Sequence, residues 1–342
     1  MKRPSATGKA SLIRGLGLGF ALGAMACGPP PAPRVPTPGE VAPGARVTAK
    51  GATSSFDQLL DEAAASDGVC VGEVHDDALH HRLQHAVLGG VLARAPEAAW
   101  AVGFEMLRQP SQPVLDRYAA GTIDIETFRR ESNWDEDWGF GFDMYRPLFE
   151  SGRDRGLDLL ALNAPRELTR AISKGGVARL APELRQRLPE LDLADPGHRR
   201  FFFAAMGFDD PAGPHGGGSS SGEGGATNAD GDPVASDETD GDQAAGDQSQ
   251  PHHHGGMNPE FFYAAQVTWD ESMADGAARW LTRNDRRVVI IAGNGHCHRA
   301  AVPNRVERRR PGRRVLSILL QNGPDGAMPH TESDFVVTLP TP

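Results

Sequence analysis

Apolar side chains follow two different spacings along this chain. Short apolar runs, each closed by glycine or a polar residue, occur at residues 69–71, 99–104, 157–162, 287–292 and 315–320. Such runs are typical of strands that are buried on both faces of a sheet. Between them, apolar residues recur every three or four positions, as on one side of a helix. This alternation predicts an α/β fold, with a mostly parallel central sheet flanked by helices.

The predicted helices are unevenly distributed between the strands. After the first strand, Asp76 and Asp77 can cap a helix that runs to about residue 95. Between the second and third strands, and again between the third and fourth, there is more helix than a crossover requires. We therefore expect a helical subdomain over about residues 107–283. The other helices are expected at residues 56–63, 110–120, 125–130, 144–155, 182–188, 198–206 and 259–282.

Composition changes this picture in one internal segment. Gly and Pro number 41 and 27 among 342 residues, more than a compact fold needs. Residues 209–257 consist largely of Gly, Ser, Asp, Gln and Ala, which predicts a disordered acidic insertion. Residues 209–250 alone carry ten Asp and Glu and no Lys or Arg, so they account for the whole formal net charge of −10. The rest of the chain is charge-balanced, and we expect no nucleic-acid partner.

The beginning of the chain has the features of an export signal. Four Lys and Arg and no acid precede an apolar stretch at residues 15–26 that is too short to span a bilayer. Residues 22–27 resemble a bacterial lipobox, in which the cysteine, here Cys27, is acylated and becomes the new N-terminus. The sequence therefore predicts a lipoprotein signal peptide over residues 1–26 and a lipid anchor at Cys27.

The residues after Cys27 indicate where such an anchored protein resides. Residues 27–55 are rich in Pro, Gly and Ala and are expected to form a tether to a folded domain at residues 56–342. Gly28, rather than Asp, follows the cysteine. This predicts a bacterial cell-envelope protein, an outer membrane lipoprotein facing the periplasm, with the membrane contacted through the lipid only.

Carboxylates and imidazoles follow three of the predicted strands. Glu73 and His75 come after the first, Glu105 after the second and His296 after the fourth. In open parallel sheets, ligands bind beyond the carboxyl ends of the strands, so we expect these four side chains to share one crevice. Two carboxylates and two imidazoles can bind a divalent metal ion or act as an acid/base set for hydrolysis.

The same residues allow simpler explanations. A carboxylate at a strand end can merely cap the next helix, although the pattern recurs at three strands. His81 and His85, four residues apart on the following helix, point the same way and can extend the site. Cys297 is either a chance neighbour of His296 or a partner for Cys70 across strands, and we expect two free thiols.

Six ordered blocks resemble the ChaN-like haem-binding uptake proteins of the Tiki superfamily. The resemblance extends over about residues 56–337, apart from the acidic insertion. The blocks are GEVHDD at 72–77 with HHRLQ at 80–84, GFEM at 103–106, Trp138 with YRPL at 145–148, ALNAPR at 161–166, QVTWDESMA at 266–274 and AGNGH at 292–296.

The resemblance implies a lipid-anchored protein that binds haem and functions in haem or iron uptake. It implies an iron ligand of the tyrosine type, a homodimer that brings two haems together and a partner in an outer-membrane haem receptor system. Of the three tyrosines, Tyr145 is our candidate ligand because it lies beside Arg146 in a matched block near several aromatic residues. Arg166 is the candidate propionate partner, and His81 completes the predicted cofactor-binding set.

The superfamily also contains metal-dependent proteases and hydrolase-like members with the same Glu and His pattern. The alternative function is therefore a metallohydrolase in which Glu73, His75, Glu105 and His296 are both metal ligands and catalytic residues. Haem or iron handling is the first hypothesis and the metallohydrolase the second. A third is a site that only recognises a small periplasmic ligand.

Overall fold

The computed structural model describes residues 34–207, 258–323 and 332–340. These residues belong to one compact unit. The predicted signal peptide, the candidate anchor Cys27 and the predicted insertion at 209–257 lie outside the described residues.

The described strands form one sheet in the order β2-β1-β8-β7-β3-β6-β4-β5. The six strands from β8 to β5 in this order are mutually parallel, whereas β1 runs antiparallel to both β2 and β8. The predicted α/β class with a mostly parallel central sheet is thus confirmed. The strands are β1 (Arg46–Ala49), β2 (Ala52–Ser54), β3 (Gly68–Val71), β4 (Ala99–Arg108), β5 (Asp158–Asn163), β6 (Arg286–Ile291), β7 (Val315–Asn322) and β8 (Phe335–Leu339).

Three of these strands are not anticipated by the apolar runs. β1 and β2 lie in the segment expected to be a tether, so that expectation is wrong for its second half. Val47 explains the difference, because it is buried and pairs with Val337 of β8 while the other residues of the hairpin keep some exposure. One anchoring side chain gives too short a pattern to be recognised in a sequence.

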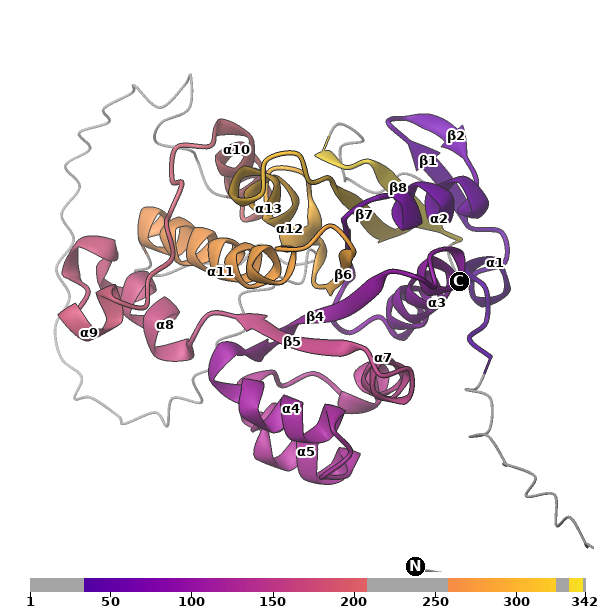
Figure 1. Ribbon diagram of the computed structural model, residues 1–342. Helices are drawn as coiled ribbons and strands as arrows, with labels where there is room; N and C mark the ends of the chain where they lie inside the picture. The colour runs from indigo at the N-terminus through magenta and orange to yellow at the C-terminus, as the bar shows by residue number, and fades with distance from the viewer. Residues whose placement is uncertain (1–33, 208–257, 324–331, 341–342) are drawn as a thin grey trace, which may run out of the picture. The chain divides into compact units, whose positions relative to one another are not determined.

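Helices cover both faces of the sheet (Figure 1). One face packs against α2 (Phe56–Ala65), α3 (Ala78–Arg94) and α7 (Phe142–Asp154). The other packs against α11 (Pro259–Trp280) and α13 (Val302–Arg309). The remaining helical segments are α1 (Pro38–Val41), η1 (Gln109–Ser111), α4 (Gln112–Ala119), α5 (Ile125–Glu131), α6 (Trp134–Asp137), α8 (Arg166–Gly175), η2 (Val177–Arg179), α9 (Pro182–Arg185), α10 (Pro196–Ala205) and α12 (Asn294–Cys297).

The central strands are buried on both sides because alternate residues face opposite layers. Val69 and Val71 of β3 join the cluster under α3 and α7, whereas Cys70 joins the cluster under α11. α3 begins where predicted, since Asp77 accepts hydrogen bonds from the N–H groups of Leu79 and His80. Among the described helices, none combines the length and the apolar character needed to cross a bilayer.

Cys70 and Cys297 form a disulfide between β3 and α12, so the expectation of two free thiols is wrong. Both residues are completely buried. Cys70 points toward the α11 side of the sheet, where α12 also lies, and this brings the two Cα atoms to 5.2 Å. That separation is within the range a disulfide spans. Spacing along the chain could not show this contact because 227 positions separate the two cysteines.

Removing this crosslink should destabilise the protein. Replacing both Cys70 and Cys297 by Ala is expected to lower the free energy of unfolding by about 2–4 kcal/mol, because the crosslink restricts the unfolded chain across a long loop. Urea unfolding of the variant and the oxidised wild type measures the difference. Coincident unfolding curves would mean that the disulfide does not form in solution.

Candidate functional site

Glu73 and His75 lie side by side in the loop between β3 and α3. Glu73 is 2% exposed, and its Oε1 is 2.5 Å from Nδ1 of His75. The hydroxyl of Tyr145, on α7, donates to the same oxygen at 3.5 Å. The second oxygen, Oε2, is buried and has no hydrogen-bond partner within the described residues. A buried, half-unsatisfied carboxylate is unusual in a folded protein and marks a candidate site.

A second set of buried groups surrounds His296, on α12. Its Nε2 is 3.1 Å from Glu105, in β4, and its Nδ1 is 2.5 Å from Asp270, on α11. The other oxygen of Asp270 is 2.6 Å from Nε2 of His198, on α10. Glu105 also accepts a hydrogen bond from the N–H group of Gly293 at 2.7 Å. An alternating chain of imidazoles and carboxylates thus runs from α10 to the sheet.

These neighbours determine the protonation states of the imidazoles in this row of hydrogen-bonded side chains. Burial lowers the pKa of His296, but Glu105 and Asp270 outweigh that effect and raise it to about 10. Burial dominates at His198 and lowers its pKa despite the contact with Asp270. For His75, Glu73 and Glu105 overcome burial and raise the pKa. His296 is therefore an imidazolium at neutral pH, held between two carboxylates.

Close backbone packing brings the two sets together. The N–H group of Asn294 donates to the carbonyl of Glu73 at 2.9 Å, and its side chain bridges to the backbone of Leu320 in both directions. A Cβ atom on Gly72 would clash with Oδ1 of Asn294. The loop after β3 can approach α12 this closely only because position 72 has no side chain.

Adding a methyl group at Gly72 should therefore disturb the site. Gly72→Ala is expected to lower the free energy of unfolding by about 1–3 kcal/mol, because Asn294 must give up its bonds to Leu320 or the loop must shift. Gly295→Ala is the matched control, since its added Cβ has no atom within 4 Å. Equal thermal stability of the two variants would contradict the close approach.

Aromatic and aliphatic side chains surround His75. Its ring centroid is 4.7 Å from that of Trp138 and 4.9 Å from that of Phe140, both half-buried. The neighbouring Val74 is 44% exposed, an unusual value for a large apolar residue. The side chains packed around the His75 ring are therefore largely aromatic, although Glu73 holds its Nδ1.

The other predicted site residues do not all lie at this cluster. His81 does adjoin the site, where its ring contacts that of Tyr145 and its Nε2 is 3.0 Å from the carbonyl of His75. Arg146 instead makes ion pairs with Glu126 and Asp143, and Arg166 lies 3.4 Å from Asp137. Both guanidinium groups are thus engaged by carboxylates other than Glu73 and Glu105. His85 is partly buried, and its Nε2 has no hydrogen-bond partner within the described residues.

Tyr145 does not have the surroundings expected for an iron ligand. It is completely buried, and burial followed by the charge of Glu73 raises its pKa well above 10. Tyr118 and Tyr263 are also buried, at 0% and 1% exposure, so all three tyrosines of the sequence lie inside the fold. Burial raises the pKa of Tyr118 to about 12.

The expectation of a divalent metal site is not supported. Within the described ranges, no three His, Cys, Asp or Glu side chains are grouped so as to hold a metal ion. The reason is that the imidazoles and carboxylates are paired with one another rather than directed at a shared point. His296, for example, uses both ring nitrogens on carboxylates.

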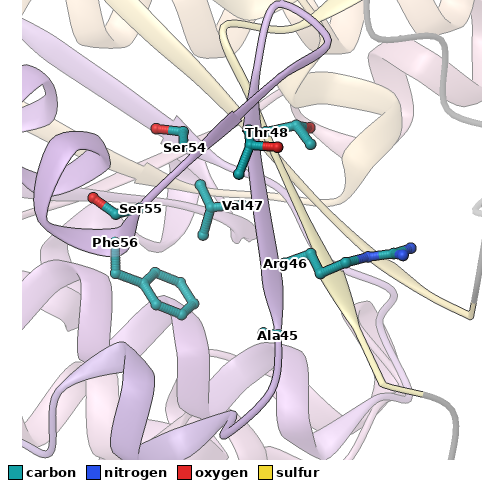
Figure 2. A pocket seen from close by; sticks show the side chains of 8 residues that line it. Ala45, Arg46, Val47, Thr48, Ser54, Ser55 and Phe56 are labelled. Atoms are coloured by element: carbon teal, nitrogen blue, oxygen red, sulfur yellow. The ribbon is translucent and has the colours of Figure 1, made fainter.

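A shallow hollow of about 400 Å³ lies elsewhere, against β1, β2 and the start of α2 (Figure 2). Its walls include Val47 and Phe56 together with the hydroxyls of Ser54 and Ser55. None of the predicted site residues lines it. Its lining has no carboxylate paired with an imidazole, unlike the cluster at the strand ends.

Two members of the cluster were missed by sequence reasoning. Asp270 lies in a matched block but on a helix, and nothing in the sequence shows which side of that helix faces the strand ends. His198 comes from α10, 72 positions earlier, and is completely buried beside Asp270. Each is one of several polar side chains on its helix, so no sequence signal singles it out.

The chain is similar to a known protein family and to a solved structure. Residues 59–306 match the model of a family described as haem-binding uptake, Tiki superfamily, ChaN. The solved structure "Cofacial heme binding to ChaN of Campylobacter jejuni" is similar to this chain, with a TM-score of 0.58 and 16% identity over 86% of this chain and 96% of that one. This likeness shows the fold. No curated protein sequence matches.

More distant similarities have TM-scores too low to support any argument. An erythromycin esterase mutant has a TM-score of 0.41 and 12% identity, over 83% of this chain and 78% of that one. A toxin effector domain from Vibrio vulnificus has a TM-score of 0.37 and 14% identity, over 87% of this chain and 39% of that one.

Proposed function

This chain belongs to the ChaN family of haem-binding uptake proteins in the Tiki superfamily, and from that premise we propose that it binds haem and functions in haem or iron uptake. The family match extends over the strands and loops that carry the described site, from α2 to α13.

One observation at the site supports this proposal most. The imidazole of His75 lies beside half-buried Trp138 and half-buried Phe140, and exposed Val74 precedes it in the chain. A porphyrin needs apolar surface for its faces and a lone-pair donor for its iron. When bound, haem supplies an iron centre, and the residues of this chain would hold it and limit the access of water. These apolar side chains and the imidazole are of the kinds that such a ligand needs, whereas the paired Arg146 does not serve it.

A titration with ferric haem tests the proposal. The purified protein is expected to give a saturable change in the visible absorption spectrum, reaching a plateau at one haem per chain. Serum albumin serves as the positive control, and the protein unfolded in urea shows how much haem binds without a folded site. A spectrum that only follows haem aggregation would contradict the proposal.

We also propose that the protein is anchored through a lipid on Cys27 and faces the periplasm. The disulfide between Cys70 and Cys297 supports this location, because stable disulfides are typical of oxidising compartments outside the cytoplasm. Labelling with a fatty-acid analogue should mark the wild type and not a Cys27→Ser variant. Equal labelling of both would contradict the anchor.

A homodimer and an outer-membrane haem receptor are the partners we propose. Support for the dimer is the cofacial haem binding described for ChaN of Campylobacter jejuni. Sedimentation with and without ferric haem tests it, and the expected result is a doubled mass with haem. An unchanged monomer would contradict the dimer while leaving haem binding intact.

A further inference from the structure

Two Asn-Gly pairs occur in the sequence, at residues 294–295 and 322–323. Asparagine followed by glycine is prone to spontaneous deamidation, because glycine has no side chain to keep the asparagine side chain away from the next backbone nitrogen. In this reaction that nitrogen attacks the carbonyl carbon of the asparagine side chain. Whether a pair reacts in the folded protein therefore depends on how freely its asparagine side chain can turn.

The side chain of Asn294 is held by hydrogen bonds at both of its polar atoms. Nδ2 donates to the carbonyl of Leu320 at 2.7 Å, and Oδ1 accepts from the N–H group of the same residue at 3.1 Å. Asn294 is only 5% exposed. Turning its side chain toward Gly295 would break both bonds inside the protein, so we expect this pair to be protected.

Asn322 has different surroundings. It is exposed and is the last residue of β7. Gly323 follows it with a φ of 90°, and a Cβ atom placed on that glycine would have no atom within 4 Å. Nδ2 of Asn322 donates to Oδ2 of Asp77 at 2.6 Å, in an exposed contact. Water can replace an exposed hydrogen bond, so this side chain can turn toward Gly323 at little cost.

We propose that Asn322 is a deamidation site, and that its conversion to aspartate or isoaspartate weakens the N-terminus of α3. The backbone nitrogen of Gly323 bonds to Cγ of Asn322, and its proton leaves with the amide nitrogen as ammonia, which closes a succinimide ring. One water molecule then opens the ring to aspartate or, through the other carbonyl, to isoaspartate. Either product is a carboxylate at neutral pH.

The new carboxylate would face the residue that caps α3. Oδ1 of Asp77 accepts from the N–H group of Leu79 at 2.7 Å and from that of His80 at 3.2 Å, while Oδ2 accepts from Asn322. Deamidation would replace this donor by an acceptor with the same charge as Asp77. Like charges repel at this separation, so Asp77 is pushed away from the position in which it caps the helix.

Two backbone contacts connect this cap to the candidate site. The N–H group of Asp77 donates to the carbonyl of Val74 at 2.9 Å, and the N–H group of Val74 donates to Nδ1 of His80 at 3.0 Å. Val74 stands between Glu73 and His75 in the chain. A charge added at position 322 would therefore disturb the loop that carries both of these site residues.

Peptide mapping by mass spectrometry tests the modification. The purified full chain is kept in warm, mildly alkaline buffer, and the peptide that contains Asn322 should gain about one dalton at least about 10-fold faster than the peptide that contains Asn294. In protein unfolded with guanidinium chloride, the two peptides should react at similar rates, which assigns the difference to the fold. Equal rates in the folded protein, or no reaction at Asn322, would overturn the proposal.

Two variants test the effect on α3. Asn322→Asp reproduces the charge of the product, and Asn322→Gln is its matched uncharged control. Amide hydrogen exchange at Leu79 and His80 should be faster in Asn322→Asp than in Asn322→Gln, and the Tm should be lower by about 2–4 °C. Equal exchange and equal Tm in the two variants would overturn the claimed effect on the N-terminus of α3.

Discussion

Replacing Asp270 by Asn is expected to lower the free energy of unfolding by about 3–5 kcal/mol, the usual cost of removing one partner from a buried charged pair. Asp270 is completely buried and accepts from both His296 and His198. Asparagine is uncharged and offers one oxygen, so the His296 imidazolium would keep Glu105 as its only counter-ion. Urea unfolding at neutral pH measures the loss.

The same variant should change how stability depends on pH. Glu105 and Asp270 raise the pKa of His296 from its ordinary 6.5 to about 10, so the stabilisation is full below pH 6.5 and is lost as the pH rises through about 10. The pKa of Asp270 is lowered, chiefly by His296 against the effect of burial, so its contribution is lost as the pH falls below about 4. Asp270→Asn should flatten both slopes, and slopes equal to those of the wild type would refute the coupling.

The second large effect is expected at the next residue of α11. Glu271 is completely buried and forms ion pairs with Arg305, Arg308 and Arg309 of α13. Arg305 is itself only 1% exposed. Glu271→Gln would leave that guanidinium buried without a full counter-charge, at a cost of about 3–5 kcal/mol.

A matched control for both variants lies one turn further along the same helix. Asp275 pairs with Arg279, whose side chain is 61% exposed, and reaches Arg309 of α13 only at 3.9 Å, so Asp275→Asn should cost less than about 1 kcal/mol. Thermal and urea unfolding of the three variants give the ranking. If Glu271→Gln and Asp275→Asn lose equally little stability, the ion pairs between α11 and α13 are not essential to the fold.

The position of the cluster could be predicted from the sequence because parallel strands end at a common edge. Glu73, Glu105 and His296 each follow a short buried run, and the sheet then brings them together. Glycines at 72 and 293 beside these residues also indicated close backbone approach, which the contact between Gly72 and Asn294 confirms.

The disulfide and the directions of the side chains on α7 depend on tertiary packing. Local sequence patterns do not show that packing. The disulfide of Cys70 requires knowing that α12 crosses the same face of the sheet to which Cys70 points. Arg146 stands next to Tyr145 in sequence, yet successive helical residues project in different directions. Its guanidinium therefore meets Glu126 and Asp143 at the surface, while Tyr145 points inward to Glu73.

The most direct test of haem binding is the haem-to-protein ratio of the chain recovered from cells supplied with haem. The protein is purified without added ligand, and haem is measured as its pyridine complex beside an elemental analysis for other metals. Our account predicts close to one haem per chain, with iron as the dominant metal. Recovery of folded protein without haem, or with another divalent metal in equal amount, would contradict it.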